Sequence, residues 1–526
     1  MSTLNSMLDR AAQEGGEKTF LVCDGRSLTF SAVHAEVRSV AEGLRLFGVA
    51  KGDRVAIVHR NAPEFVISYF AVNRLGAIAV PINFMVQKAD ELAHMLKDCG
   101  ALGAVTQAEF LTGLTGAAVQ CPALKALWVT DGKPASSPPV VRDFTELRAP
   151  APSGPAPDPI SDADVAAILY TSGTTGFPKG VMLTHRNLVT NCESSLKRIA
   201  LTRRDVTLCI LPMFHSFSWT AIVLTSTRLT LKCVIFPAIA PPRPWLKAMG
   251  AHGVTLFAAV PQIYAALARE ARDWKTRLYL RLWAFRKVRL AVSGAAPLPA
   301  SVAAAFAAAV GPDIIEGWGL TETSPVATVV PPRALKVGFV GTPLDGVRLK
   351  IVDDAEAELA PGSEGEICVR GDNVMKGYWN LPDATKAAFT ADGWLKTGDV
   401  GFIDPDGYLA IRDRKKDMII VKGLKVFSAQ VEAILAENPA IEESAIVGVP
   451  DEEGDETIKA FVVLKKGCRL EKAALLQYFR EKLDAYKRPR DVEIVDSLPK
   501  NALQKVLKRE LRERELAKRT GAAGKA

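Results

Sequence analysis

Long apolar runs are absent: the 526 residues contain no uninterrupted apolar stretch of the ~18 residues that a membrane-spanning helix needs. The N-terminus, MSTLNSMLDRAAQEGGEK, also lacks the basic-then-apolar pattern of a secretory signal peptide. The 8 cysteines are scattered and form no C-x-x-C pair, which argues against a zinc site and against a disulfide framework. We therefore expect a protein of the reducing cytoplasm.

Two common catalytic patterns are missing as well. A P-loop ATPase requires G-x-x-x-x-G-K-[ST], but from Gly173 this chain reads GTTGFPKG, so a hydroxyl residue does not follow the lysine. No Ser-His-Asp set for nucleophilic catalysis is recognisable either. Any phosphate chemistry must therefore use another kind of loop.

The bulk properties are those of a globular protein with a modest excess of positive charge. The apolar fraction is 48%, the mean hydropathy is +0.11 and the net charge is +8. Residues 486–526 carry twelve Lys/Arg against six Asp/Glu. Such a basic tail could bind nucleic acid, an anionic membrane surface or a polyanionic ligand. Because acidic residues are interspersed among the basic ones, a solvated helix face is the favoured interpretation. We expect no nucleic-acid partner and leave open a peripheral association with the inner face of a membrane.

The stretch 170–185, YTSGTTGFPKGVMLTH, combines glycines, hydroxyls and a lysine between apolar segments. Glycines let the backbone bring its N–H groups close to an anion, hydroxyls add donors, and a lysine adds a mobile positive charge. The alternative is a solvated linker between two ordinary elements. The pattern predicts a strand, a phosphate-binding loop and then a helix. The candidate phosphate-binding residues are Thr171, Ser172, Gly173, Thr174, Thr175, Gly176 and Lys179.

YTSGTTGFPKG resembles the signature of the adenylate-forming superfamily, which comprises acyl-CoA synthetases, peptide-synthetase adenylation domains and luciferases. Four further stretches resemble that family in the same order along the chain. They are LPMFH (211–215), SGAAP (293–297), EGWGLTETSP (316–325) and DGWLKTGDVGFIDPDGYLAIRDRKKD (392–417), followed by a catalytic-lysine segment, LPKNALQK (498–505). The resemblance covers essentially the whole chain.

The resemblance implies ATP, Mg²⁺ and coenzyme A as ligands and a role for each motif. Glu322 would hold Mg²⁺ with help from Thr171, Trp318 would lie on the adenine, and Asp399 with Arg414 would hold the ribose. His215 would border the carboxylate of the acid, and Trp219 would stand at the mouth of an acyl tunnel. The remaining implied contacts to ATP are Gly294, Ala295, Ala296, Gly317, Gly319 and Thr321, and those to the acyl group are Val260 and Gly294.

Without the family, several of these residues have plain structural explanations. His215 reads as a satisfied core histidine, Trp219 as ordinary core, and the Gly294 turn as a tight strand-to-helix connection. Asp399 follows a glycine and is expected in a turn, where a short carboxylate can accept hydrogen bonds from vicinal hydroxyls. An isolated Thr321–Glu322 pair would usually be a capping device.

The last segment implies the catalytic lysine, Lys505, and a hinge at Lys416, with Lys422 and Gly423 on the face that receives coenzyme A. Two departures from the family pattern stand out. Gln504 replaces the glycine that precedes the lysine, and a Cβ there restricts the backbone. In residues 423–432, GLKVFSAQVE, Ser428 and Gln430 stand where many members have Pro and Glu.

The fold expected is α/β, with a large N-terminal domain over residues 1–414 and a small mobile α+β domain over 415–526. The resemblance implies that the large domain contains layered α/β parts and a small β-barrel-like part. Among the local elements we expect a helix over 26–47 ending at a glycine, a strand at 53–60, helices near 427–436 and 471–484, and a proline-rich connection over 134–159.

The function implied is an acid–CoA ligase for a medium- or long-chain fatty acid, acting as a monomer or homodimer. Its acid would be converted to an acyl-adenylate and then passed to coenzyme A. The alternatives are a ligase for an aryl acid, a ligase that loads a carrier protein, and a catalytically silent relative that binds an acyl-adenylate, for which Gln504 is the hint.

Overall fold

A computed structural model describes residues 3–86, 88–132, 140–150, 159–171, 178–332, 334–421, 424–450, 456–501 and 505–523. The chain forms two compact units. Unit 1 comprises residues 1–348 and 369–395, and unit 2 comprises 349–368 and 396–526. A domain boundary at 414/415 stays a prediction. No helix in the described ranges is long and apolar enough to cross a membrane.

Unit 1 contains an eight-stranded sheet with the order β19-β9-β8-β4-β3-β5-β6-β7. Neighbouring strands are parallel except for the antiparallel pairs β8–β9 and β9–β19 at one edge. The strands are β3 Arg54–Val58, β4 Ile78–Pro81, β5 Gly103–Thr106, β6 Ala126–Val129, β7 Val140–Asp143, β8 Val165–Thr171, β9 Lys179–Thr184 and β19 Gly377–Tyr378. The helical segments between them are α3 Pro63–Arg74, α4 Ala89–Cys99, η1 Ala108–Phe110, α5 Leu111–Ala118 and η2 Phe144–Leu147.

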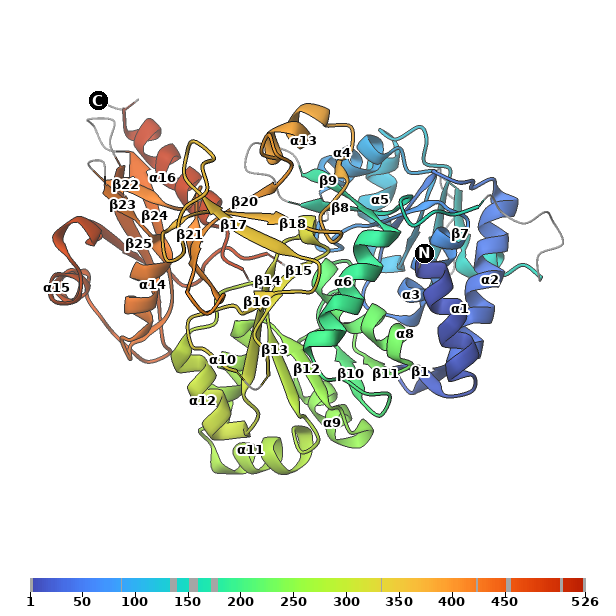
Figure 1. The fold of residues 1–526 in the computed structure, drawn as a ribbon, viewed down its shortest axis with the longest axis horizontal. Coiled ribbons are helices and arrows are strands. Elements are labelled where there is room, and N and C mark those ends of the chain that lie inside the picture. Colours follow the sequence, from blue (N-terminus) through green and yellow to red (C-terminus); the bar gives the residue numbers. More distant parts are fainter. Residues whose placement is uncertain are drawn as a thin grey trace. The chain divides into compact units, whose positions relative to one another are not determined.

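A nine-stranded sheet forms the rest of the core of unit 1, with the order β16-β15-β14-β13-β12-β10-β11-β1-β2 (Figure 1). Its central strands, from β11 to β14, are all parallel. The strands are β1 Thr19–Cys23, β2 Arg26–Thr29, β10 Val206–Cys209, β11 Lys232–Ile235, β12 Leu256–Ala259, β13 Leu290–Ser293, β14 Ile314–Gly319, β15 Val326–Val329 and β16 Thr342–Pro343. Both faces of such parallel strands are buried, which explains their continuous apolar sequences.

Unit 1 contains further helices. They are α1 Leu4–Gly15, α2 Phe30–Phe47, α6 His185–Arg198, α7 Ser216–Ser218, α8 Thr225–Leu229, α9 Arg243–His252, α10 Pro261–Glu270, α11 Trp274–Tyr279, α12 Ala300–Val310 and α13 Pro382–Ala388, with π-helical turns η3 Trp219–Leu224 and η4 Leu280–Ala284 and a 3₁₀ turn η5 Thr321–Thr323. Together, the two sheets and their helices confirm the predicted α/β class.

Unit 2 is built on smaller sheets. Its strands are β17 Arg348–Val352, β18 Gly365–Arg370, β20 Leu395–Ile403 and β21 Leu409–Arg414, then β22 Ile419–Val421 with β23 Leu424–Val426, and finally β24 Ile441–Pro450, β25 Glu456–Leu464 and β26 Asp491–Ile494. Its helices are α14 Ser428–Ala436, α15 Lys472–Lys482, η6 Ala485–Lys487 and α16 Lys508–Ala523. Val431, Leu435, Leu475 and Phe479 pack with β24 and β25 in its core.

Several local expectations were met and others were wrong. Helix α2 ends at Gly48, whose φ of +102° suits glycine, as expected from the periodicity. Its predicted start was wrong, because residues 26–29 form strand β2. Around 170–185 the predicted strand is β8 and the predicted helix is α6, whose N-cap is Thr184, but strand β9, which pairs with β8 before α6 begins, was not predicted. Within the proline-rich connection, residues 140–143 form strand β7 beside β6, so a loop was the wrong prediction there.

Candidate active site

The carboxyl ends of the parallel strands in the nine-stranded sheet bring together three of the sequence motifs. His215 follows β10, Val260 follows β12, and Gly294 follows β13. In the registers of the sheet Ala259 lies opposite Ser293, and Ser293 opposite Glu316. Because parallel strands end at one edge, this is where open α/β sheets bind ligands. The edge therefore joins residues that are about a hundred positions apart in the chain.

The turn after β13 is tightly packed and strained. A Cβ on Gly294 would lie 3.3 Å from the Phe217 ring and 3.6 Å from the Gly317 carbonyl oxygen. Ala295 has a φ of +68°, a left-handed conformation that residues with a Cβ seldom adopt and that concentrates at functional sites. Packing against Phe217 is thus a second reason for the small residue at position 294, besides the close approach of a ligand. Ala296 is half-buried.

His215 caps the short helix α7 and is held in place by its neighbours. Its Nδ1 accepts a hydrogen bond from the Phe217 N–H at 3.2 Å, which makes Nε2 the protonated nitrogen of the neutral ring. The preceding loop is fixed by Asn61, whose side chain accepts from Met213 N–H at 2.7 Å and donates to the Leu211 carbonyl at 2.9 Å. The histidine is only half-buried, so its ring is oriented without being sealed in the core.

Trp219 lies in an aromatic cluster rather than on the surface. Only 2% of the residue is exposed, and its ring stacks on Tyr69 with the centroids 3.8 Å apart. Phe65 and Phe70 lie within 6 Å of the same ring. The Nε1 of Trp219 and the hydroxyl of Tyr69 are buried without a hydrogen-bond partner among the described residues. A role for Trp219 at the mouth of an acyl tunnel stays a prediction.

Glu322 is linked to the base of the predicted phosphate loop through Tyr378. The Tyr378 hydroxyl donates to Oε1 of Glu322 at 3.0 Å, and the Lys179 ammonium lies 5.2 Å from the centre of the same ring. Lys179 is the register partner of Thr171, so these two close the hairpin between β8 and β9. Burial and the nearby carboxylate raise the pKa of Tyr378. Tyr378 therefore contacts the Glu322 carboxylate through its hydroxyl and the Lys179 ammonium through its ring.

Residues 172–177 lie outside the described residues, and with them the predicted sites Ser172, Gly173, Thr174, Thr175 and Gly176. What can be described is the frame of that loop, Thr171 and Lys179.

The chemistry at Glu322 fits a magnesium ion that is shared with phosphates. No described residue donates a hydrogen bond to Oε2, which leaves one carboxylate oxygen for a hard cation. Among the described residues no group of three His, Cys, Asp or Glu side chains could form a metal site alone. Mg²⁺ commonly binds one or two carboxylates and takes its other ligands from phosphates and water. Glu322 with the phosphates of a bound nucleotide meets that requirement.

Other residues of the EGWGLTE segment have clear structural roles. Trp318 lies near the end of β14 opposite Thr328 and is half-buried, as are Gly317 and Thr321. A Cβ on Gly319 would lie only 1.8 Å from the Pro325 carbonyl oxygen, so local packing alone requires that glycine. Hydrogen bonds from the Asn373 amide to the Thr323 carbonyl and from Met375 N–H to the Glu322 carbonyl hold the turn.

Sequence reasoning missed three residues of this region. Tyr378 lies far from Glu322 in the chain and belongs to no motif that we recognised. Phe217 was passed over as an ordinary aromatic. Glu316 was not singled out, yet burial raises its pKa to about 7. The burial of this carboxyl within strand β14 is a signal that only the fold reveals.

In unit 2, Asp399 and Arg414 form an ion pair. Asp399 was expected in a turn, but it lies within β20, directly opposite Arg414 of β21. The prediction was wrong because the Gly-Asp pattern is local turn chemistry, whereas pairing with β21 is a longer-range contact. The Arg414 Nε lies 3.3 Å from Asp399 Oδ1, and Asp399 is 4% exposed. Antiparallel register therefore places the two predicted ribose-binding side chains next to each other.

Lys505 shares this environment in unit 2. It lies in a loop closed by the Lys500–Val506 bridge, and its N–H donates to the Asn501 side chain at 2.9 Å. Burial, and next the charge of Arg414, lower the pKa of Lys505 to about 8, while Asp399 raises it. The side chain is thus still mostly charged at physiological pH, but it loses its proton at a lower pH than an ordinary lysine.

The other predicted residues of unit 2 are less informative. Lys416 lies in the turn that follows β21, and a hinge there stays a prediction. Lys422, Gly423 and Gln504 lie outside the described residues, so the predicted face for coenzyme A and the departure before the catalytic lysine are not described.

Ser428, where many family members have proline, takes part in a buried polar network. Its hydroxyl donates to Asp413 Oδ2 at 2.7 Å and accepts from the Lys508 ammonium at 2.7 Å. Lys508 also pairs with Glu432 at 2.7 Å. The network ties the start of α14 and the start of α16 to strand β21, so this departure adds hydrogen bonds that a proline would not make.

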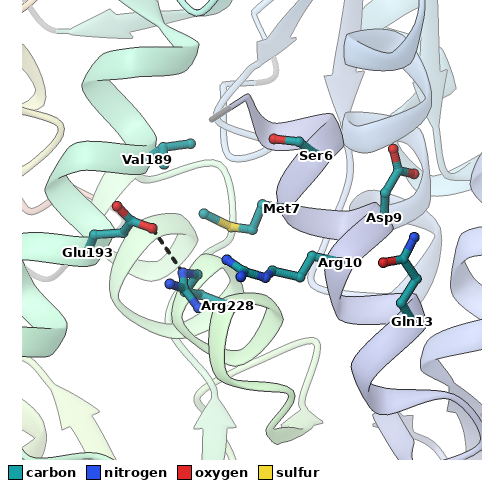
Figure 2. Close-up of a pocket in the computed structure, with 8 residues that line it drawn as sticks. All are labelled: Ser6, Met7, Asp9, Arg10, Gln13, Val189, Glu193 and Arg228. Atoms are coloured by element: carbon teal, nitrogen blue, oxygen red, sulfur yellow. Dashed lines mark hydrogen bonds and ion pairs between the residues drawn. The ribbon is translucent and has the colours of Figure 1, made fainter. Parts of the chain in front are cut away.

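A separate cavity of about 330 Å³ lies between α1, α6 and α8 (Figure 2). Its charges are already compensated within the protein. Arg228 pairs with Glu193 at 3.0 Å, Arg10 with Glu14 at 3.1 Å, and Asp9 with Arg74 at 2.7 Å. None of the sequence-predicted site residues lines it.

Comparison with known proteins gives consistent results. The family model described as "AMP-binding enzyme" matches residues 8–379, and the model described as "AMP-binding enzyme C-terminal domain" matches 430–505. A long-chain-fatty-acid–CoA ligase of Bacillus subtilis (strain 168) is 35% identical over 98% of this chain and 94% of its own length. A feruloyl-CoA synthase of Amycolatopsis sp is 36% identical over 97% and 99%. The solved structure of an anthranilate CoA ligase in complex with anthranoyl-AMP has a TM-score of 0.88 at 30% identity, over 98% of this chain and 97% of that one.

Proposed function

Because the chain belongs to the AMP-binding enzyme family, the adenylate-forming ligases, we propose that it is an ATP-dependent acid–CoA ligase whose acid is a medium- or long-chain fatty acid. The observation that carries this proposal is the Lys179–Tyr378–Glu322 arrangement. It joins the base of a glycine-hydroxyl loop to a carboxylate, one of whose oxygens accepts no hydrogen bond from a described residue. That combination suits a magnesium-bound triphosphate.

In the first step an oxygen of the acid's carboxylate attacks the α-phosphorus of ATP. The bond from that phosphorus to the pyrophosphate oxygen breaks, and pyrophosphate leaves. Because negative charge concentrates in this transition state, the protein contributes positioning and positive charge. Lys505 contacts both the carboxylate and the α-phosphate, and His215 borders the acid. Mg²⁺, when bound to Glu322, supplies charge that offsets the phosphates.

The nucleotide is held by the other motif residues. Thr171 and the loop up to Lys179 bind the β- and γ-phosphates, together with Thr321. Trp318 and the turn 294–296 contact the adenine, and the adjacent Asp399 and Arg414 hold the ribose. The Asp399 carboxylate accepts from the vicinal hydroxyls.

In the second step the thiol of coenzyme A attacks the acyl carbonyl carbon of the adenylate. The bond to the phosphate oxygen breaks, and AMP leaves with that oxygen. Residues beyond Lys416 turn between the two steps, and Lys422 with Gly423 replace Lys505 at the reacting centre. The proton of the thiol leaves with the products, so the chemistry balances without a protein nucleophile.

A second candidate, an aryl acid, is favoured by one specific observation. The Tyr69 hydroxyl and the Trp219 Nε1 are buried without partners among the described residues, and a ring hydroxyl of an aryl substrate could satisfy them. The feruloyl-CoA synthase that resembles this chain acts on such an acid, as its name says.

A panel of acids distinguishes these functions. We expect AMP release to require an acid, and we expect coenzyme A to accelerate turnover. For straight-chain acids, kcat/KM should rise about fourfold per added methylene until the site is filled. The panel would run from butyrate to palmitate and include ferulate and anthranilate. A maximum on ferulate or anthranilate would favour the aryl function, and no AMP release with any acid would favour a silent relative.

A further inference from the structure

One exposed surface of unit 1 is unusual for a water-soluble protein. Helix α11 and the turn η4 form one continuous helical segment over 274–284. Along it Trp274 is 67% exposed, Leu278 50% and Leu282 59%, and these residues recur every four positions on one face. Tyr279 and Trp283 are exposed beside them, at 40% and 44%. Single exposed apolar residues are common, but a contiguous group of this size indicates an interaction surface.

The segment is anchored, so its exposed residues are not needed for packing. Leu280, Ala284 and Phe285 are buried on its inner side. The Phe285 ring packs edge-on against Phe257 and Phe306, with centroid distances of 5.1 and 5.5 Å. In Figure 1 the segment lies along the margin of the nine-stranded sheet, with α9 and α12 on either side of it.

The charged residues around these apolar side chains are almost all positive. Residues 272–287 contain six Lys/Arg and a single acidic residue, Asp273. Asp273 is already used as the N-cap of α11, accepting from Thr276 N–H at 2.8 Å and from its hydroxyl at 2.9 Å. The six basic residues are all exposed: Arg272, Lys275, Arg277, Arg281, Arg286 and Lys287. Among the described residues, none forms an ion pair with Arg281, Arg286 or Lys287.

The neighbouring helices extend the surface. Helix α12 is made of alanine, valine, serine and phenylalanine and has no charged residue, and Ala304, Ala305 and Ala308 are exposed on it. Arg277 donates to the Ala308 carbonyl at 3.2 Å, which joins α11 to α12. On the other side α9 adds the exposed Lys247, whose carbonyl accepts from Trp283 Nε1 at 3.3 Å.

We propose that the surface formed by residues 272–287 docks on an anionic phospholipid bilayer. Trp274, Leu278 and Leu282 enter the headgroup–acyl boundary, where indole and tyrosine rings are favoured, and the six basic residues contact lipid phosphates. A second copy of the chain is disfavoured as the occupant, because its identical face would place like charges together.

The basic C-terminal tail, as far as the structure describes it, does not offer such a surface. On α16 the ammonium of Lys508 pairs with Glu432, Arg512 pairs with Glu456, and Lys518 pairs with Glu493. These three charges of α16 are therefore compensated within unit 2 itself. Docking through 272–287 does not depend on which acid the enzyme activates, so the two proposals can fail separately.

Co-sedimentation of the full-length protein with vesicles tests the proposal. We expect binding to vesicles of phosphatidylcholine mixed with phosphatidylglycerol and little binding to phosphatidylcholine alone. Replacing two inserted residues, Trp274→Gln with Leu282→Gln, should weaken binding at least about tenfold, because their buried apolar area drives insertion. Replacing two basic residues, Arg281→Gln with Lys287→Gln, should weaken binding and reduce its dependence on salt.

The matched control is Leu46→Gln, which removes a leucine that is 66% exposed on α2 and should leave binding unchanged. Retained thermal melting and retained AMP release with a water-soluble acid would show that the variants are folded. The proposal is overturned if the wild-type protein ignores anionic vesicles, or if the double variants bind like the wild type. It is also overturned if Trp274→Gln with Leu282→Gln abolishes a homodimer in solution, because the surface would then be a contact between copies.

Discussion

Replacing Lys505 by alanine is expected to slow formation of the adenylate by about 10²-fold, measured as acid-dependent ATP–pyrophosphate exchange. A charge-assisted contact contributes about 1.5–3 kcal/mol, and Lys505 is proposed to make such contacts only in this step. Thioester formation from supplied acyl-AMP and coenzyme A should keep the wild-type rate. An equal fall in both half-reactions would contradict the separate roles of Lys505 and of the Lys422–Gly423 face.

Two controls separate the charge of Lys505 from the structure of its loop. Lys500, in the same loop, pairs with Glu443 at 2.5 Å, and Lys500→Ala should leave exchange nearly intact. The pKa of Lys505, lowered to about 8 chiefly by burial, means that its ammonium is charged below pH 8 and neutral above. In the free enzyme kcat/KM for ATP should therefore fall on the alkaline side near pH 8, and Lys505→Arg should remove that fall. An unchanged profile in Lys505→Arg would mean that another group titrates.

Replacing Glu322 by alanine should lower kcat/KM for ATP by about 10²-fold and raise the Mg²⁺ concentration needed for half-maximal exchange. The reason is that Glu322 supplies the proposed protein carboxylate for the metal, one of whose oxygens is free of hydrogen bonds from described residues. The measurement is the exchange rate over a titration of Mg²⁺ at fixed ATP.

Tyr378→Phe is the matched control for Glu322. It removes the 3.0 Å hydrogen bond to Oε1 but keeps the ring that lies against Lys179. We expect a loss of about tenfold or less, with a smaller change in the Mg²⁺ requirement, because the carboxylate itself remains. If Glu322→Ala left the Mg²⁺ dependence unchanged, or if Tyr378→Phe cost as much, the carboxylate would be structural and the metal would lie elsewhere.

The elements that could be predicted from the sequence are those with strong local signals. The periodicity of α2 and the left-handed Gly48 after it locate a helix end without any long-range information. Strand β9, Lys179–Thr184, was missed because its short apolar run does not by itself distinguish a strand from the approach to a helix. Asp399 was misplaced for the same reason: its neighbours suggest a turn, and only pairing with β21 reveals a strand.

The candidate site shows a similar division. The residues of the motifs were found because their composition is unusual, and the order of parallel strands then brings His215, Val260 and Gly294 to one sheet edge. Tyr378 could not be found, since its contact with Glu322 depends on β19 joining the edge of the other sheet beside β9. The exposed face of α11 was equally hidden, because apolar spacing does not distinguish a helix that faces the core from one that faces solvent.

The central claim, that the acid is activated as an acyl-adenylate, is tested most directly by labelling. The enzyme would turn over an acid carrying ¹⁸O in its carboxylate, with ATP and coenzyme A, and the released nucleotide would be analysed by mass spectrometry. Because the carboxylate oxygen becomes the bridge to the α-phosphorus, each AMP should carry a single labelled oxygen. Label in orthophosphate with release of ADP, or unlabelled AMP, would contradict the account.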